Sequence, residues 1–310
     1  MAGTTQQQIQ LQAQQFFAAA RVALNRGDYD EYARNIQLGY RLKPSNNVPA
    51  FPQDGAAISR DQLLKLREKA RALIDRGVIF SPTIAALAYA EAKLGDKAAV
   101  GRLADYDHFF KVQSSVAPDF AGGRFFETLA DEVRSKLNYY GVPSNRERTI
   151  HNAWRHEAIF DLQRPAVQAL KKELYRRVDQ YVAELPKDSD HPFIASRPRE
   201  YKLEGWAVVS KDEGHHGAHI HPRAWIEGVY YILQPDTADD SEPDAGHLKV
   251  GPPLGVTPES GWPERSVAPV PGTLVLMPGY FYHASRPTRV EQERMCIAFD
   301  VTPIELVHAR

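Results

Sequence analysis

The sequence predicts an α+β protein with a helical first part and an antiparallel β second part. Apolar residues recur every three or four positions from residue 5 to about residue 185, and beyond residue 200 the period changes to two. The apolar runs of the second part are short and are separated by Pro, Gly and Asp, without helix-length insertions. This pattern favours an antiparallel sandwich or barrel over a parallel sheet.

The length and charge of the chain narrow the choice of partners. At 310 residues the chain is long enough for two domains, and we place a helical region over 1–115 and the β-containing domain with its buttressing helices over 116–310. The formal net charge is −1, so there is no basic excess for nucleic acid. No run of about 18 apolar residues spans a membrane and no secretory signal begins the chain, so we expect a cytoplasmic protein. The oligomeric state is left open.

The helical part contains two similar units. Helices are predicted on either side of Gly27–Asp28, ending at Pro44, and the same scheme recurs around Gly95–Asp96. These units resemble tetratricopeptide-type repeats, which would form a concave surface for a peptide or protein. The other predicted helices cover 60–76 with Ser59 as N-cap, 123–138, and 165–185 with Leu170, Leu174, Val178 and Tyr181 on one apolar face.

The second part contains the predicted strands and two polar segments. Strands are predicted over 204–210, 218–221, 228–234, 246–250, 266–270, 272–277 and 294–301. The segments 236–244 and 251–265 are candidates for a lid over the open end of the barrel.

A histidine-rich segment, HHGAHIHP, marks the candidate metal site. In a strand, residues i and i+2 project to one face, so His219 and His221 can direct both imidazoles to one point. We expect His283 as the third ligand, because the turn at Pro278–Gly279 returns it to the same end of the barrel. Three ligands on one face of an octahedron leave three positions for substrates. The histidines expected to be structural are His215, His216, His247 and His308.

The segments HIHPRAWIEGVYYIL and PGTLVLMPGYFYHASRPTRVEQERMCIAFDV resemble those of iron(II)- and 2-oxoglutarate-dependent oxygenases, in the subgroup with H-x-H-P and an SGVYYL-like strand. The resemblance covers about residues 118–302. It implies a double-stranded β-helix (jelly roll), iron held by His219, His221 and His283, and the 2-oxoglutarate tail held by Arg294. Tyr231 is similar to a position that donates its hydroxyl to the same carboxylate.

The residue pattern around Arg294 supports this role independently. A guanidinium binds a carboxylate through two charge-assisted hydrogen bonds. Arg294, Cys296 and Ala298 share one face of the last predicted strand, where the two small side chains leave room for a dicarboxylate. Cys296 is expected to be inert filler. The alternatives for the arginine are Arg286 and Arg289, and Arg294 could instead form a surface ion pair.

Two residues depart from the family pattern. His221 stands where the wider superfamily usually has the aspartate of H-x-D, which would leave the iron with three neutral ligands. Glu227 stands where the subgroup tends to have a serine. Glu227 could supply a carboxylate to the metal or to a substrate amine, or it could be a residue at the rim of the barrel.

The resemblance implies an oxygenase that uses Fe(II), 2-oxoglutarate and dioxygen. The expected reaction hydroxylates an unactivated carbon of an amino acid, peptide or other small metabolite and releases succinate and carbon dioxide, with the protein positioning and shielding the reactants. One alternative is a cupin-type metalloenzyme, which also uses H-x-H and a later histidine but not 2-oxoglutarate. Another is a non-catalytic helical-repeat binding protein.

Overall fold

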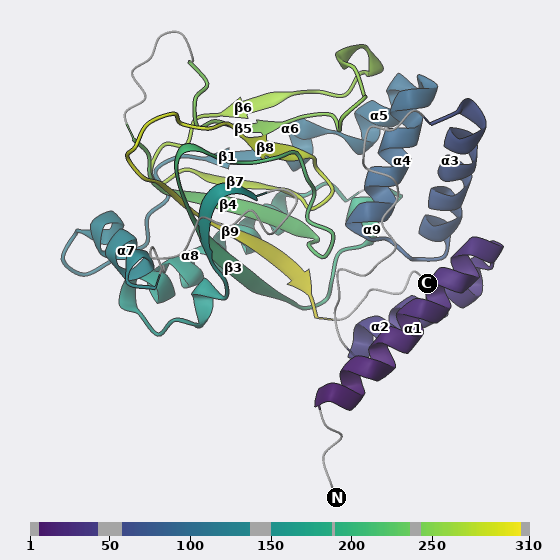
Figure 1. Cartoon of the computed structure of the whole chain (residues 1–310), viewed down its shortest axis with the longest axis horizontal. Coiled ribbons are helices and arrows are strands. Elements are labelled where there is room, and N and C mark those ends of the chain that lie inside the picture. The colour runs from purple at the N-terminus through teal and green to yellow at the C-terminus, as the bar shows by residue number, and fades with distance from the viewer. Residues whose placement is uncertain (1–5, 43–57, 137–149, 188–189, 236–242, 305–310) are drawn as a thin grey trace, which may run out of the picture.

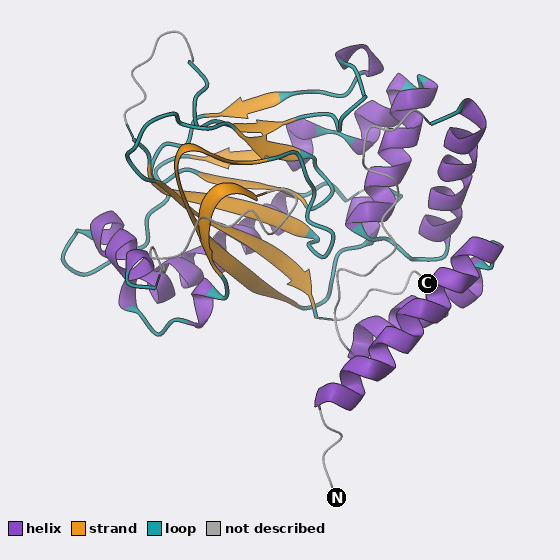
Figure 2. Cartoon of the chain, in the orientation of Figure 1, coloured by secondary structure: helices purple, strands orange, loops and turns teal. Residues whose placement is uncertain are grey.

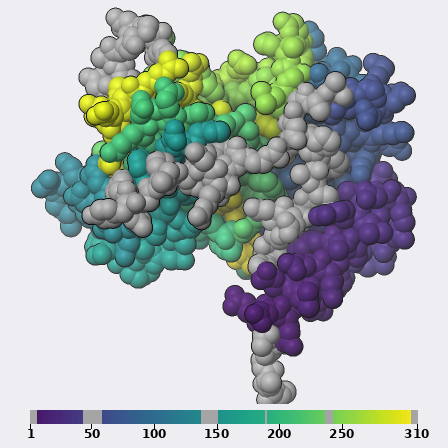
Figure 3. All heavy atoms as spheres, in the orientation of Figure 1, coloured from purple at the N-terminus to yellow at the C-terminus, as the bar shows by residue number. Residues whose placement is uncertain are grey.

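The computed structural model describes residues 6–42, 58–136, 150–187, 190–235 and 243–304. Helices of the first part lie on one flank of the molecule and the sheets lie beside them (Figures 1 and 2). Figure 3 shows the N-terminal helices gathered along this flank. The predicted α+β class and jelly roll are confirmed, because two antiparallel sheets follow the first helices.

Six helices form the helical flank. They are α1 (Gln6–Arg26), α2 (Tyr29–Leu42), α3 (Arg60–Asp75), α4 (Ser81–Leu94), α5 (Lys97–Leu103) and α6 (Tyr106–Phe109). Both predicted Gly-Asp turns are present, with positive φ at Gly27 (77°) and Gly95 (86°), a conformation that glycine adopts without strain. Asp96 then caps α5 by accepting from the Ala99 N–H at 3.0 Å. Because α5 is short, the second unit is less regular than the first, and the tetratricopeptide likeness stays a prediction.

Three further helices support the sheets, namely α7 (Phe125–Arg134), α8 (Pro165–Glu184) and α9 (Pro192–Ala195). The predicted apolar face of α8 is confirmed, because Leu170, Leu174, Val178 and Tyr181 are all buried. The Tyr181 hydroxyl donates to the Phe109 carbonyl at 2.7 Å, which ties α8 to the end of the helical flank. Predicted helix 123–138 is shorter than expected, and its residues beyond 136 lie outside the described ranges.

The strands form a large and a small sheet. They are β1 (Lys111–Gln113), β2 (Ile150–His156), β3 (Tyr201–His216), β4 (Ile226–Leu233), β5 (Leu248–Val250), β6 (Arg265–Val267), β7 (Leu274–Pro278), β8 (His283–Ser285) and β9 (Arg294–Pro303). The six-stranded sheet has the order β1-β7-β4-β9-β3-β2 and the three-stranded sheet the order β6-β5-β8. In Figure 1 the small sheet lies above the large one.

One predicted strand is wrong. Residues 218–221 form no regular strand but only an isolated antiparallel bridge between His219 and His283. The prediction failed because the chain turns at Pro222, so His221 makes its backbone bond with Gly279 instead of continuing a ladder. Strands β1 and β8, of three residues each, and the mainly polar strand β2 were not predicted, because such segments carry little apolar periodicity.

The helical flank and the sheets share one hydrophobic core, which runs from Ala13 to Val301. Strand β1 lies on the helical side of the predicted boundary at residue 115 but pairs with β7 of the large sheet. The division into domains at this boundary stays a prediction. Among the helices within the described ranges, none has the length and apolarity needed to cross a bilayer, and the cytoplasmic location stays a prediction.

Candidate metal centre and cosubstrate pocket

A cavity of about 730 Å³ opens against the large sheet. Strand β9 supplies one wall through alternate residues, namely Arg294, Cys296, Ala298 and Asp300. The predicted common face of the first three is therefore confirmed, while Met295, Ile297 and Phe299 between them are buried on the other side. Strand β4 adds Glu227, Val229 and Tyr231 by the same alternation.

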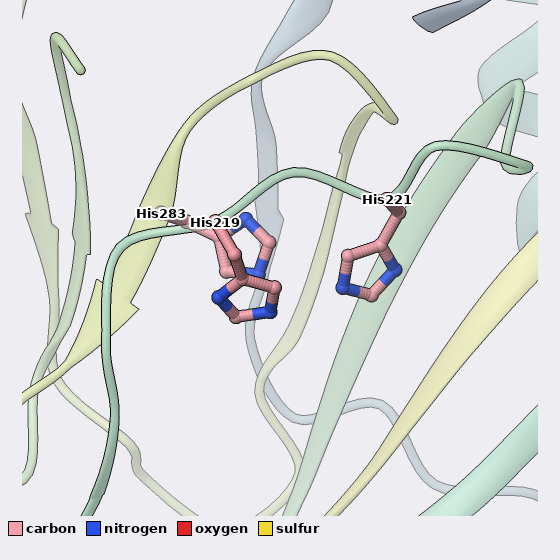
Figure 4. A group of neighbouring side chains, drawn as sticks. All are labelled: His219, His221 and His283. Atoms are coloured by element: carbon pink, nitrogen blue, oxygen red, sulfur yellow. The ribbon is translucent and has the colours of Figure 1, made fainter. Parts of the chain in front are cut away.

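Three histidines meet at one end of this cavity. His219, His221 and His283 each offer one ring nitrogen, and these three atoms lie within 4.8 Å of one another. The ring centroids of His219 and His283 are 4.2 Å apart, and that of His221 is 5.0 Å from His283. Figure 4 shows the rings projecting into a common space. The structure thus brings together the three residues that the sequence analysis selected.

The backbone holds these histidines in place from two remote segments. His219 and His283 exchange two backbone hydrogen bonds, each 3.0 Å long, and the His221 N–H donates to the Gly279 carbonyl at 2.8 Å. A Cβ on Gly279 would lie 2.3 Å from the Ala224 carbonyl oxygen, so this turn requires glycine. The Pro278–Gly279 turn therefore returns His283 to the H-x-H segment, as predicted.

Each imidazole uses its Nδ1 for a hydrogen bond to an acceptor. The Nδ1 of His219 lies 2.7 Å from the Gly217 carbonyl and that of His283 lies 3.2 Å from the Phe281 carbonyl. The Nδ1 of His221 lies 2.5 Å from Asp300 Oδ1. Because carbonyls and carboxylates accept, Nδ1 carries the proton in each ring and Nε2 is left for a metal.

The surroundings favour the neutral rings that bind metals. Burial lowers the pKa of His283 to about 4, and burial followed by the neighbouring histidines holds that of His219 well below its usual range. Neutral imidazole is the form that ligates a cation, since a proton on Nε2 blocks the lone pair. His219 and His283 therefore offer deprotonated nitrogen donors without having to release protons at neutral pH.

A cationic and a phenolic donor line the same cavity. Arg294 is 3% exposed and Tyr231 is 0% exposed, and the guanidinium carbon lies 5.3 Å from the tyrosine ring centre. Among the described residues, neither Arg294 Nε nor the Tyr231 hydroxyl has a hydrogen-bond partner. A buried donor without a partner costs about 1–3 kcal/mol, so this pair fits a ligand with acceptor oxygens. The alternative role of Arg294, a surface ion pair with Glu291 or Glu293, is not observed, because the side chain is buried.

Glu227 is not a rim residue. Its side chain is 1% exposed, with Oε2 lying 3.2 Å from His221 Nε2 and Oε1 lying 3.1 Å from His283 Nδ1. Neither close approach has the direction of a hydrogen bond, and both carboxylate oxygens lack a hydrogen-bond partner within the described ranges. Burial raises the pKa of Glu227 well above its ordinary value.

Two residues of the site were missed by sequence reasoning. Asp300 orients His221, and its position four strand residues beyond Cys296 would have placed it on the cavity face by alternation. His216, expected to be structural, lines the cavity, and its ring centroid lies 5.9 Å from that of His219. It is nonetheless not part of the group of three ligand atoms within 4.8 Å.

The remaining candidates lie away from the cavity. Arg286 contacts Asp244 at 3.2 Å and Arg289 contacts Glu213 at 3.3 Å, so neither competes with Arg294 for a ligand. No residue of 251–265 lines the cavity, and Trp262 of this segment donates to the Tyr106 hydroxyl on the helical flank, so a lid formed by this segment is not observed. His215 stacks on His151 and His247 contacts Ser266. Residues 236–242 of the other lid candidate and His308 lie outside the described residues.

Comparison with known proteins finds a family model that matches the segment containing this site. Residues 204–300 match the model of a putative 2OG-Fe(II) oxygenase family, a range that extends from β3 to β9 and includes all three histidines and Arg294. The predicted class of enzyme, a 2-oxoglutarate-dependent Fe(II) oxygenase, is thereby confirmed, together with its metal and cosubstrate. Comparison with curated proteins finds no match.

Solved structures with a similar fold are distant in sequence. A prolyl-4-hydroxylase of Pseudomonas putida is 18% identical, with coverage of 69% of this chain and 98% of that chain and a TM-score of 0.42. A 2OG-Fe(II) oxygenase family oxidoreductase of Burkholderia pseudomallei is 14% identical, with coverage of 69% and 94% and a TM-score of 0.44. HygX of Streptomyces hygroscopicus, solved with nickel, 2-oxoglutarate and hygromycin B bound, is 16% identical, with coverage of 65% and 86% and a TM-score of 0.42.

The side chains present fit both groups that the family uses. Three imidazoles with protonated Nδ1 atoms suit a divalent first-row metal such as Fe(II). The buried donors of Arg294 and Tyr231 suit the distal carboxylate of 2-oxoglutarate, and the small side chains of Cys296 and Ala298 lie on the same wall of the cavity.

Proposed function

We propose that this protein is a hydroxylase in which His219, His221 and His283 hold Fe(II) and Arg294 and Tyr231 hold 2-oxoglutarate. The observation that carries the proposal is the convergence of three histidine ring nitrogens on a cavity that also contains a buried, incompletely partnered guanidinium. When bound, iron with 2-oxoglutarate and dioxygen supplies the oxidising chemistry, with succinate and carbon dioxide as coproducts.

The chain's own residues bind and orient the reactants. Asp300 and the carbonyls of Gly217 and Phe281 accept from the three imidazole rings and so hold their orientation before a metal enters. Arg294 fixes the position of the cosubstrate through its charge, and the buried location strengthens this interaction by excluding water. No side chain is required as a nucleophile.

The outer wall of the cavity suits an amino acid, a peptide or another small polar metabolite. Trp206 provides an aromatic surface beside His221, with ring centroids 5.5 Å apart, and the Arg155 guanidinium lies 4.4 Å from the Trp206 ring centre. Lys202 and Glu204 line the same region and place both signs of charge there. A wall with an aromatic ring and charges of both signs is suited to a zwitterionic or peptide substrate.

The decisive experiment measures conversion of 2-oxoglutarate to succinate by purified protein with and without Fe(II), in the presence of amino acid, peptide and metabolite pools. We expect succinate only with iron, and more succinate with a true substrate, whose mass increases by one oxygen atom. Iron-dependent oxidation of a substrate without consumption of 2-oxoglutarate would instead favour the cupin-type alternative. Binding of iron with no turnover of any pool would favour a non-catalytic protein.

A further inference from the structure

Two turns carry histidines of the metal centre, and these turns contact each other directly. One turn follows His221 and ends at Trp225, and the other follows β7 and leads to His283. The His221 N–H donates to the Gly279 carbonyl at 2.8 Å, and the Gly279 N–H donates to the Trp225 carbonyl at 3.0 Å. Because these hydrogen bonds join the two turns, whatever holds the turns together also sets the position of His221 relative to His283.

A serine of the helical flank lies where the two turns meet. Ser81, the first residue of α4, is 6% exposed, and its hydroxyl donates to the Ala224 carbonyl at 2.6 Å. A Cβ on Gly279 would lie 2.3 Å from the Ala224 oxygen and 2.9 Å from Ser81 Oγ. The lack of a side chain at Gly279 therefore lets the backbone of one turn, the carbonyl of the other and the hydroxyl of α4 pack at one point.

A tyrosine makes a second connection between the helical flank and the turn that leads to His283. Tyr280 is 1% exposed, and its hydroxyl donates at 2.6 Å to the carbonyl of Leu103, the last residue of α5. The next residue, Phe281, packs its ring against Tyr106 of α6, with ring centroids 4.6 Å apart. The Phe281 carbonyl is the acceptor for His283 Nδ1 at 3.2 Å. The helical flank thus holds the residue that orients this imidazole.

Another buried hydroxyl of α4 differs from Ser81 in its partners. Thr83 is 1% exposed, yet its hydroxyl has no hydrogen-bond partner within the described ranges. Helix α4 therefore tolerates a buried hydroxyl that only packs. The Ser81 hydroxyl, in contrast, reaches a carbonyl 143 residues further along the chain, in the turn that follows His221. A buried carbonyl that loses its donor is unfavourable, so without this hydroxyl the turn would shift toward another partner.

We propose that the helical flank is part of the metal centre, and that Ser81 and Tyr280 are positioning residues that hold the two ligand-bearing turns at the separation a metal requires. The inference rests on the proposed metal site. The ring centroids of His221 and His283 lie 5.0 Å apart, and the two hydroxyls fix the backbone of the turn beside each ring. The helical flank then has a role at the metal whether or not its surface binds a peptide.

The test uses full-length, metal-free protein titrated with Co(II), whose visible absorption bands respond to the number and geometry of its ligands. Binding is followed by calorimetry and by the absorption spectrum. Loss of an outer-shell partner weakens metal binding by about 10- to 100-fold. Because Ser81 and Tyr280 act through the backbone, we expect the lower end of this range, about 10-fold, in both Ser81→Ala and Tyr280→Phe, with a change in the absorption bands. The double variant should bind Co(II) more weakly than either single variant.

The matched control is Thr83→Val, which removes the hydroxyl of α4 that has no partner among the described residues. It should leave the Co(II) affinity and spectrum unchanged, and an equal loss in this variant would overturn the inference, since general loosening of the helical flank would explain the result. Tyr280→Phe carries the test if Ser81→Ala does not fold.

Wild-type affinity and bands in Ser81→Ala and Tyr280→Phe, even with a lower melting temperature, would leave the two hydroxyls with a structural role only and overturn the inference. Iron-dependent succinate formation by the wild type alongside that result leaves the proposed function intact. A wild type that binds no Co(II) and forms no succinate overturns both.

Discussion

Two buried glutamates, one on the helical flank and one in the cavity, differ in the partners that surround their carboxylates. Glu91 on α4 is 0% exposed, and Arg71 donates to it at 2.6 Å with Arg67 at 3.6 Å. Glu227 on β4 is 1% exposed, and within the described part of the chain it contacts the imidazoles of His221 and His283 without a hydrogen bond. The helical flank supplies its own counter-charge and uses the acid for packing. In the cavity the acid contacts imidazoles and burial raises its pKa, so a buried acid without a cationic partner among the described residues distinguishes the cavity from the helical flank.

The largest effect should come from removing a histidine at the metal end of the cavity. In His283→Ala we expect iron-dependent succinate formation to fall by at least about 1000-fold, because the metal's contribution of several kcal/mol to the reaction is lost. The melting temperature of the metal-free protein should change little in comparison. His247→Ala, at a half-buried histidine outside the cavity that contacts Ser266, is the control and should retain activity. Full activity in His283→Ala would contradict the assigned ligand set.

The next effect tests the cosubstrate end of the same cavity. Arg294→Lys keeps the charge but loses the forked donor, and we expect the KM for 2-oxoglutarate to rise by about 10- to 100-fold, the equivalent of about 1.5–3 kcal/mol. Arg286→Lys, at an exposed residue paired with Asp244, serves as the matched control. Steady-state kinetics at saturating iron measure both. Equal KM values in the two variants would show that Arg294 does not bind 2-oxoglutarate.

A comparison of stabilities tests the contrast between the two acids directly. Arg71→Met removes the closer partner of Glu91 and should destabilise the protein by about 1–3 kcal/mol, below the usual cost of an unpaired buried charge because Arg71 is half exposed. Glu227→Gln should leave the metal-free protein equally stable or more stable, since burial raises the pKa of Glu227 and already favours the neutral carboxyl, which glutamine resembles. Chemical denaturation of both variants in the presence of a chelator measures the difference. Equal destabilisation would show that Glu227 has a structural partner after all.

The smallest effect is expected at Tyr231. Tyr231→Phe removes one hydroxyl donor and should raise the KM for 2-oxoglutarate by about 5-fold, since a single neutral hydrogen bond contributes about 1 kcal/mol. Because the ring packs in the core with 0% exposure, the phenylalanine should preserve stability. A KM identical to that of the wild type, measured in parallel, would show that the hydroxyl does not reach the cosubstrate.

Strand alternation explains how much of the site the sequence could reveal. The period of two placed Arg294, Cys296 and Ala298 on one face, and the same rule extends to Asp300 and, on β4, to Glu227 and Tyr231. The segment 218–221 was wrongly predicted as a strand, although its two histidines do converge as expected. Their convergence comes from an isolated bridge to His283 and the turn at Pro222, which are contacts between remote segments.

The sequence by itself determined the change from helix to strand, the three metal-binding candidates and the arginine, because periodicity and residue chemistry are local properties of the chain. Only the tertiary structure decided that Asp300 orients His221, that Trp206 and His216 line the cavity, and that Glu227 is buried without a counter-charge. These facts depend on which strands pair and how the two sheets face each other. Pairing joins residues as far apart as Glu227 and Asp300, and the charge balance of a buried group is set by all of its neighbours at once.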